Sequence, residues 1–177
     1  MFRPLEGVKV LDLSRVLAGP YTAKLLSDLG AYVLRVEAPW GDDTRGWGPP
    51  FTEIENEQVA AYWTSVNLGK SVIRKNLKNE NDLQEVRKLI SESDIIIENF
   101  RPGKSEGWFA PWPDEAIVCN ISAYGNDGLR FREGGYDIVM QARSGLMSIT
   151  GDENGNTAKV GVAAVSYTHL TLPTTTP

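Results

Sequence analysis

A stretch near the amino terminus, VKVLDLSRVLAGPYTAKLLSDLGAYVLRVE (residues 8–37), decides the fold. Residues 8–13 and 31–37 are short apolar runs, which are typical of buried strands. Between them, Pro20 suits the first turn of a helix and Gly30 suits the position just beyond its end. This helix would bury one apolar face, made by Thr22, Leu25, Leu26 and Leu29. A strand, a helix and a second strand in this order predict a right-handed parallel βαβ unit.

The same alternation continues along the chain. A short helix is expected around residues 57–65, and a clearer one begins at a cap on Asn81 and buries Leu83, Val86 and Ile90. Further buried strands are expected at 94–100 and 116–122, followed by a helix from about 136 to 147. The pattern predicts an α/β fold with a Rossmann-like parallel sheet and helices on both faces. In such sheets ligands bind beyond the carboxyl ends of the strands.

Composition excludes several classes of function. The chain has 177 residues, 41% of them hydrophobic, and a net charge of −5, which argues against general binding to nucleic acid or to anionic membranes. With one cysteine, Cys119, and one histidine, His169, neither an intrachain disulfide nor a Cys/His zinc site can form. The apolar runs are too short to span a bilayer, and the start of the chain does not resemble a signal peptide. We therefore expect a cytoplasmic protein.

Two loop motifs invite functional interpretations that the residues do not support. The turn after the first strand carries only Gly19 where a dinucleotide site needs G-x-G-x-x-G, although Glu37 stands where the ribose-binding acid would be. NAD binding is therefore disfavoured. Paired carboxylates can bind metal or act as acid and base. Asp42 and Asp43 lie in a glycine-rich loop, and we expect a solvated turn with an Asx hydrogen bond there instead.

Cations gather around the predicted strand ends. Asn99 and the charged Arg101 and Lys104 follow the strand at 94–100 directly. The stretch GKSVIRKNLK (69–78) adds Lys70, Arg74, Lys75 and Lys78. In a net-acidic chain this clustering favours a phosphate-bearing ligand, although lysines on a solvated strand edge are the simpler interpretation. The residues show no Ser/His/Asp or Cys/His constellation, and Cys119 is expected to be inert core.

Linked motifs from Pro4 to Val165 resemble the class III CoA-transferase family, the CaiB/BaiF type. They are the opening stretch and GDDTRGWGPPF, SVNLGKS, DIIIENFRPGK, ISAYGNDG and GGYDIVMQARSGLMSITG. The resemblance implies exchange of CoA between an acyl-CoA and a free carboxylic acid, most similar to members that use dicarboxylates. It further implies an aspartate nucleophile, coenzyme A as a substrate and not a covalently bound cofactor, no metal, and an interlocked homodimer for the full-length parent.

The resemblance also implies CoA contacts in four segments. They are Val16, Leu17 and Ala18; Lys75, Asn76, Leu77 and Lys78; Asn99, Phe100 and Arg101; and Tyr136 with Asp137. The chain departs from the family pattern at Ala38 and Gly107, where members carry arginines. Loss of two charge-assisted contacts, each worth about 1.5–3 kcal/mol, would weaken CoA binding.

The family places its nucleophilic aspartate where this chain has Ser166. From that residue the sequence reads SYTHLTLPTTTP, so we expect residues 1–165 to be the family region and 166–177 a foreign or out-of-frame tail that packs poorly. The chain would then be an inactive CoA-binding portion. A non-catalytic CoA- or nucleotide-binding module is the alternative. The racemase branch is disfavoured because Tyr136 stands where its members carry a histidine as acid–base residue.

Overall fold

The computed structural model describes residues 3–166, which belong to two compact units, Met1–Ile121 and Ser122–Pro177. The expected poor packing of residues 167–177 concerns a segment outside the described residues. Within 3–166, no helix has the length and apolar character needed to cross a membrane. The sequence-based division at residue 165 stays a prediction.

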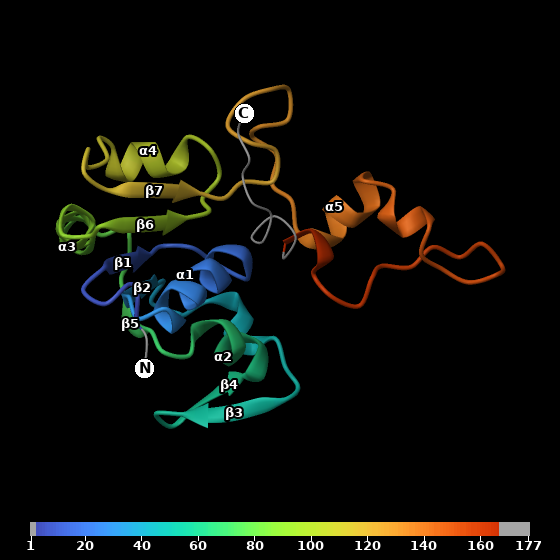
Figure 1. Ribbon diagram of the computed structural model, residues 1–177, viewed down its shortest axis with the longest axis horizontal. Coiled ribbons are helices and arrows are strands. Elements are labelled where there is room, and N and C mark those ends of the chain that lie inside the picture. The colour runs from blue at the N-terminus through green and yellow to red at the C-terminus, as the bar shows by residue number, and fades with distance from the viewer. Residues whose placement is uncertain (1–2, 167–177) are drawn as a thin grey trace. The chain divides into compact units, whose positions relative to one another are not determined.

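The first unit is built on a five-stranded, fully parallel sheet with strand order β5-β2-β1-β6-β7. In Figure 1 the strands follow one another in this order from the bottom of the sheet to its top. Its strands are β1 (Lys9–Asp12), β2 (Tyr32–Glu37), β5 (Ser71–Arg74), β6 (Ile95–Glu98) and β7 (Ile117–Asn120). The predicted parallel βαβ unit and the two later strands are confirmed. The strand order reverses between β1 and β6, so the carboxyl ends of these strands flank the crevice where doubly wound sheets bind ligands.

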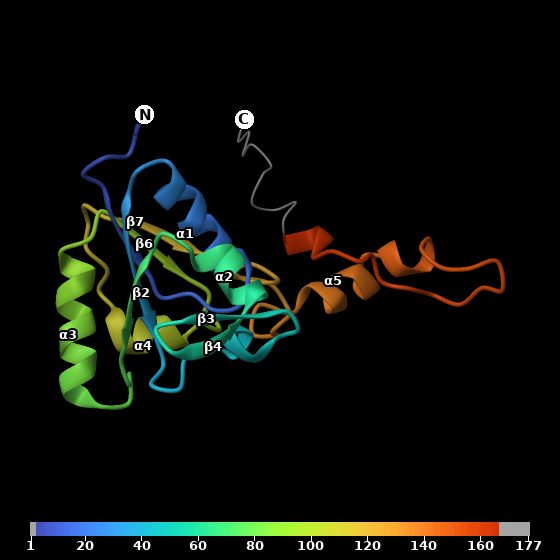
Figure 2. The ribbon, with the colours of Figure 1, turned by 90° about the horizontal axis from the view of Figure 1, so that it is seen from below.

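Helices cover both faces of the sheet, as predicted (Figure 2). They are α1 (Ala18–Asp28) and α2 (Ala61–Asn67) on one side, and α3 (Glu80–Ser91) and α4 (Lys104–Phe109) on the other. Alternate residues of β1 face opposite cores: Val10 packs with Ala23 of α1, and Leu11 packs with Val86 of α3. This alternation is the period of two that a strand imposes on its side chains.

The buried face of α1 differs from the prediction. Leu25 and Leu29 are exposed, whereas Gly19 and Ala23 are buried. A Cβ atom added to Gly19 would lie 2.2 Å from the Cβ of Ser14. Leu26 of the predicted face packs against the buried cluster on this side. At its first turn the helix packs through a glycine, because it approaches the loop after β1 too closely for a Cβ atom to fit.

Two local predictions are also wrong. A hairpin of β3 (Phe51–Ile54) and β4 (Glu57–Ala60) precedes α2, so the helix expected at 57–65 starts only at Ala61. The cap of α3 is Asn79 instead of Asn81: its Oδ1 accepts hydrogen bonds from the amides of Asn81 and Asp82, at 2.9 and 3.2 Å.

The second unit contains α5 (Asp137–Arg143) and the 3₁₀ helix η2 (Leu146–Ser148). The predicted helix at 136–147 is interrupted by Gly145, whose φ of 82° is left-handed. The other described residues of this unit form turns and irregular backbone, a bridge between Gly151 and Thr157, and a helical stretch at 164–166. Among the described residues of this unit, only Gln141 is a fully buried side chain.

Replacing the cap of α3 tests the corrected helix start. We expect Asn79→Ala to lower the free energy of unfolding by about 1 kcal/mol, because two amides lose their acceptor. Asn81→Ala is the matched control and should be neutral or slightly stabilising, since alanine is the better helix former. Urea unfolding followed by circular dichroism measures both, and equal losses for the two variants would contradict the assignment.

Candidate functional site

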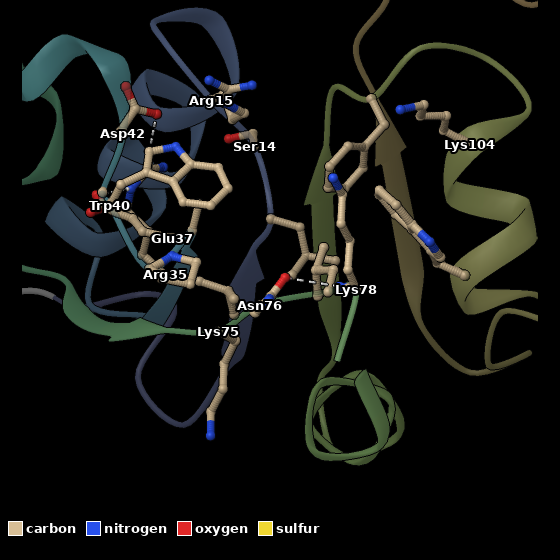
Figure 3. A pocket seen from close by; sticks show the side chains of 18 residues that line it. Ser14, Arg15, Arg35, Glu37, Trp40, Asp42, Lys75, Asn76, Lys78 and Lys104 are labelled. Carbon is tan, nitrogen blue, oxygen red and sulfur yellow. Dashed lines mark hydrogen bonds and ion pairs between the residues drawn. The ribbon is translucent and has the colours of Figure 1, made fainter. Parts of the chain in front are cut away.

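A cavity of about 300 Å³ opens at the carboxyl ends of the central strands (Figure 3). Its walls come from the segments that follow β1, β2, β5 and β6, and from α4. The volume is at the lower end of the range for small-molecule sites. The first unit thus has a pocket at the place where its fold predicts one.

The charged floor beside this pocket is a buried ion network centred on Arg35, which is 1% exposed. The guanidinium donates from Nη1 to Asp12 at 2.9 Å, from Nε to Glu37 at 3.0 Å and from Nη2 to Asp42 at 2.8 Å. Arg45 and the indole of Trp63 donate to the same Glu37 carboxylate, at 2.7 and 2.8 Å. Because every member has a partner, the burial of these charges is compensated.

Lys70 completes the network from the residue that precedes β5. Its ammonium donates to Asp12 at 2.9 Å, to the carbonyl oxygen of Pro20 at 2.7 Å and to the side chain of Asn67 at 2.9 Å. Burial lowers the pKa of Lys70 to about 8, although the Asp12 carboxylate favours its charged form. Burial by itself would raise the pKa of Asp12, but Arg35 and Lys70 oppose this and hold it below its ordinary value. Lys70 is therefore no ligand-binding cation, contrary to the grouping drawn from the sequence.

The expectation of a solvated turn at residues 42–43 is wrong for its first member. Asp42 is 5% exposed, and its carboxylate accepts hydrogen bonds from Thr44, from Arg35 and from the amide of Val16. The Asx hydrogen bond to the amide of Thr44, at 2.9 Å, is confirmed. Burial raises the pKa of Asp42, but the hydrogen bonds from Thr44 and the charge of Arg35 outweigh it and leave the pKa lowered.

The pocket walls combine aromatic rings with cations. Trp40 is 73% exposed and lies on one side in Figure 3. Phe100, from the segment after β6, and Trp108, from α4, also line the pocket, with ring centroids 5.5 Å apart. Among the described residues, no ion pair involves Lys78 or Lys104, both of which line the cavity. Aromatic faces and uncompensated cations together suit a ligand with a flat ring and phosphate groups.

The pocket brings together part of the expected CoA-contact set. Lys75, Asn76, Leu77, Lys78 and Phe100 line it. Lys75 points away from its centre (Figure 3) and forms an ion pair with Glu85, and this hydrogen bond raises the pKa of the lysine.

The remaining expected contacts of the first unit stand outside the lining. These are Val16, Leu17, Ala18, Asn99 and Arg101. Leu17 is 5% exposed and packed into the fold, so it is not an open apolar lip. The side-chain amide of Asn99 is engaged with the backbone of Arg15, donating to its oxygen and accepting from its nitrogen, both at 2.8 Å.

In the second unit, the carboxylate of Asp137 at the start of α5 forms hydrogen bonds with the backbone at residues 165 and 166. Its Oδ1 accepts hydrogen bonds from the amides of Val165 and Ser166, both at 2.9 Å. Gln141 binds the same segment, accepting from the amide of Val160 at 2.8 Å. The carboxylate of Asp137 is thus occupied by the chain itself, and Tyr136 beside it is exposed.

The model of CoA-transferase family III matches residues 5–169. The chain belongs to CoA-transferase family III. The resemblance found in its motifs is thereby confirmed, and so is the α/β fold, because a crystal structure of a CAIB/BAIF family protein from Brucella suis matches with a TM-score of 0.88. That match has 39% identity and covers 94% of this chain and 46% of the other.

Relatives of this family III chain include succinyl-CoA:glutarate CoA-transferase from Homo sapiens, 45% identical over 168 residues, which cover 91% of this chain and 37% of the relative. Succinate–glutarate CoA-transferase from Agrobacterium fabrum is 41% identical over 169 residues, which cover 90% of this chain and 42% of the relative. The chain therefore spans about two fifths of the length of these relatives.

Sequence reasoning did not place the aromatic wall residues Trp40 and Trp108 of the family III chain at the site, whereas it had counted Lys104 among the cations at the strand ends. Trp40 stands in a loop whose path no periodicity predicts. Lys104 lies three residues and Trp108 seven residues beyond Arg101, the last expected contact of the first unit, and both belong to α4. An aromatic residue four positions after a lysine, directly past a strand end, was the available signal, since such residues share one helix face.

The buried lysine makes a pH-dependent contribution to stability. Between pH 8 and the ordinary pKa of 10.5, Lys70 carries a proton in the unfolded chain but not in the folded one. The free energy of unfolding should therefore rise with pH across this window. We expect Lys70→Gln to lose that rise relative to the parent chain, while Lys88→Gln, a change at an exposed lysine, retains it. Urea titrations from pH 7.5 to 10.5 measure the slopes, and identical slopes for all three would contradict the burial of a titrating amine.

Proposed function

We propose that the chain is the CoA-binding portion of a transferase that moves CoA between an acyl-CoA and a free dicarboxylic acid. The observation that carries the proposal is the pocket at the strand-order reversal, with aromatic walls and the unpaired cations Lys78 and Lys104. Family membership and the names of the relatives support CoA as the ligand. The acyl donor and the acceptor acid within that class come from the relatives alone.

The pocket would take the nucleotide end of CoA. A purine ring can stack between aromatic walls, and the phosphates would lie near the ammonium groups of Lys78 and Lys104. Of the two departures from the family pattern, Ala38 lines the pocket, whereas Gly107 is not a lining residue and a Cβ there would meet open space. The structure thus leaves room for the two arginines that other members carry, and their absence places more of the binding on the lysines.

We further propose that this polypeptide binds CoA without transferring it. Residue 166, where the family has its aspartate, is a serine, whose hydroxyl is not ionised at neutral pH and needs a base. Among the described residues there is no histidine to act as that base. The interlocked homodimer of the full-length parent also stays a proposal.

Calorimetric titration of CoA into the chain tests the binding site. We expect Lys78→Ala and Lys104→Ala each to weaken binding by about threefold to tenfold at low salt, because exposed cations contribute modestly and are screened. Lys88→Ala is the matched control, since this exposed lysine lies outside the pocket. Unchanged affinity in both pocket variants would place the ligand elsewhere.

An exchange assay tests the proposed lack of transfer. Labelled succinate or glutarate is incubated with succinyl-CoA and the 177-residue chain, and we expect no label in the CoA ester above background. Ser166→Asp should not restore exchange, because a carboxylate alone does not position the acceptor acid, and positioning supplies several kcal/mol of a catalytic effect. Exchange by the parent chain that Ser166→Ala abolishes would show that the serine is a working nucleophile.

A further inference from the structure

The turn that follows β1 contains the most unusual backbone conformation in the first unit. Val16 has a φ of 69°, in the left-handed region that β-branched residues avoid. Such strain persists only where the surrounding structure enforces it, and it is found where geometry serves function. The neighbours of Val16 supply that enforcement from two directions.

The first restraint is the side chain of Asn99. Backbone pairing between β1 and β6 continues to the amide of Leu13, which donates to the oxygen of Ile97 at 2.8 Å. After Leu13 the backbone no longer pairs with β6. The side-chain amide of Asn99 instead forms hydrogen bonds with the backbone nitrogen and oxygen of Arg15, each at 2.8 Å. A side chain thus extends the ladder by one step and fixes the residue before Val16.

The second restraint comes from the buried ion network. The amide of Val16 donates to Oδ2 of Asp42 at 3.1 Å, and the same oxygen accepts from Nη2 of Arg35 at 2.8 Å. Arg15 adds an exposed ion pair from its guanidinium to Asp43, at 2.5 Å. The loops that follow β2 and β6 therefore converge on two consecutive residues of the loop that follows β1.

The left-handed turn has a structural consequence for the pocket. It folds the chain back so that Gly19 of α1 packs against Ser14, where no Cβ would fit. Ser14 and Arg15 line the cavity. A relaxed conformation at Val16 would swing the start of α1 and these two residues away from their present places.

We propose that Asn99 is a positioning residue, which acts on ligand binding by holding Val16 in its left-handed conformation and not by contacting CoA through its side chain. This proposal rests on the proposed function in taking CoA as the ligand. The family resemblance implies that Asn99 contacts CoA. The proposal differs, because the side-chain amide of Asn99 already forms hydrogen bonds with the backbone of Arg15.

Glycine provides the decisive test, since it adopts a positive φ without steric cost. We expect Asn99→Ala to weaken CoA binding about tenfold, as a strained residue released from its restraint relaxes. Adding Val16→Gly should restore the affinity to within about threefold of the parent, because glycine keeps the turn accessible without the restraint. Val16→Ala is the matched control: it removes the same branched group but keeps a Cβ, so it should rescue poorly.

Calorimetry measures the four affinities, and thermal unfolding shows whether each variant is folded. If Asn99 contacts CoA directly, Val16→Gly cannot rescue its loss, and that result would overturn the proposal. If the parent chain binds no CoA, the proposed function fails, and amide hydrogen exchange decides the positioning role instead. Hydrogen exchange at the amide of residue 16 should then be at least about tenfold faster in Asn99→Ala than in the parent chain. It should slow again when Val16→Gly is added to Asn99→Ala. Unchanged exchange in Asn99→Ala would refute it.

Discussion

The pocket depends on one buried guanidinium. Arg35 cannot release its proton in a protein, so its burial requires carboxylates around it. Asp12, Glu37 and Asp42 supply them from the end of β1, the end of β2 and the loop beyond. Breaking one partner of such a buried group typically costs about 3–5 kcal/mol. The network therefore fixes the relative positions of the segments that form the walls of the cavity.

The charges near the pocket divide into two groups with different tasks. The buried charged groups form ion pairs with one another, so none of them is left to bind a ligand. The cations Arg35, Lys70 and Arg45 pair with the carboxylates of Asp12, Glu37 and Asp42. The exposed Lys78 and Lys104 sit on the outer wall. Under the proposed function, the paired buried charges hold the pocket walls in place before the ligand arrives and the two lysines meet its phosphates, which reduces the ordering cost of binding.

The sequence predicted what depends on local pattern. Apolar runs located four of the five parallel strands, all but β5, and their order along the chain predicted a site at their carboxyl ends, where the pocket lies. The errors arose where contacts between residues far apart in the sequence decide which side chains are buried. Lys70 looked like a surface cation because its partner Asp12 lies 58 positions away.

The same limit applies elsewhere in the fold and the site. Leu25 and Leu29 looked like part of the inner face of α1 but are exposed, whereas Gly19 and Ala23 are buried and Gly19 lies against the loop before the helix. The resemblance supplied the family and five of the pocket-lining residues. It could not supply Trp40 or the role of Asn99, because both depend on how separate loops meet in space.

The burial of Lys70 also bears on the proposed function, because a protein that binds acyl-CoA would encounter thioesters. An amine with a pKa near 8 has a large unprotonated fraction in mildly alkaline conditions, and such amines react with acyl-CoA esters. Lys70 has the electronic character of a self-acylation target, yet its side chain is 0% exposed and its nitrogen donates to three acceptors. Lys75, which stands at the pocket, stays protonated because Glu85 raises its pKa. The fold thus shields this lysine by enclosure and a nearby accessible one by charge, and both would resist acylation by the acyl-CoA that we propose as the ligand.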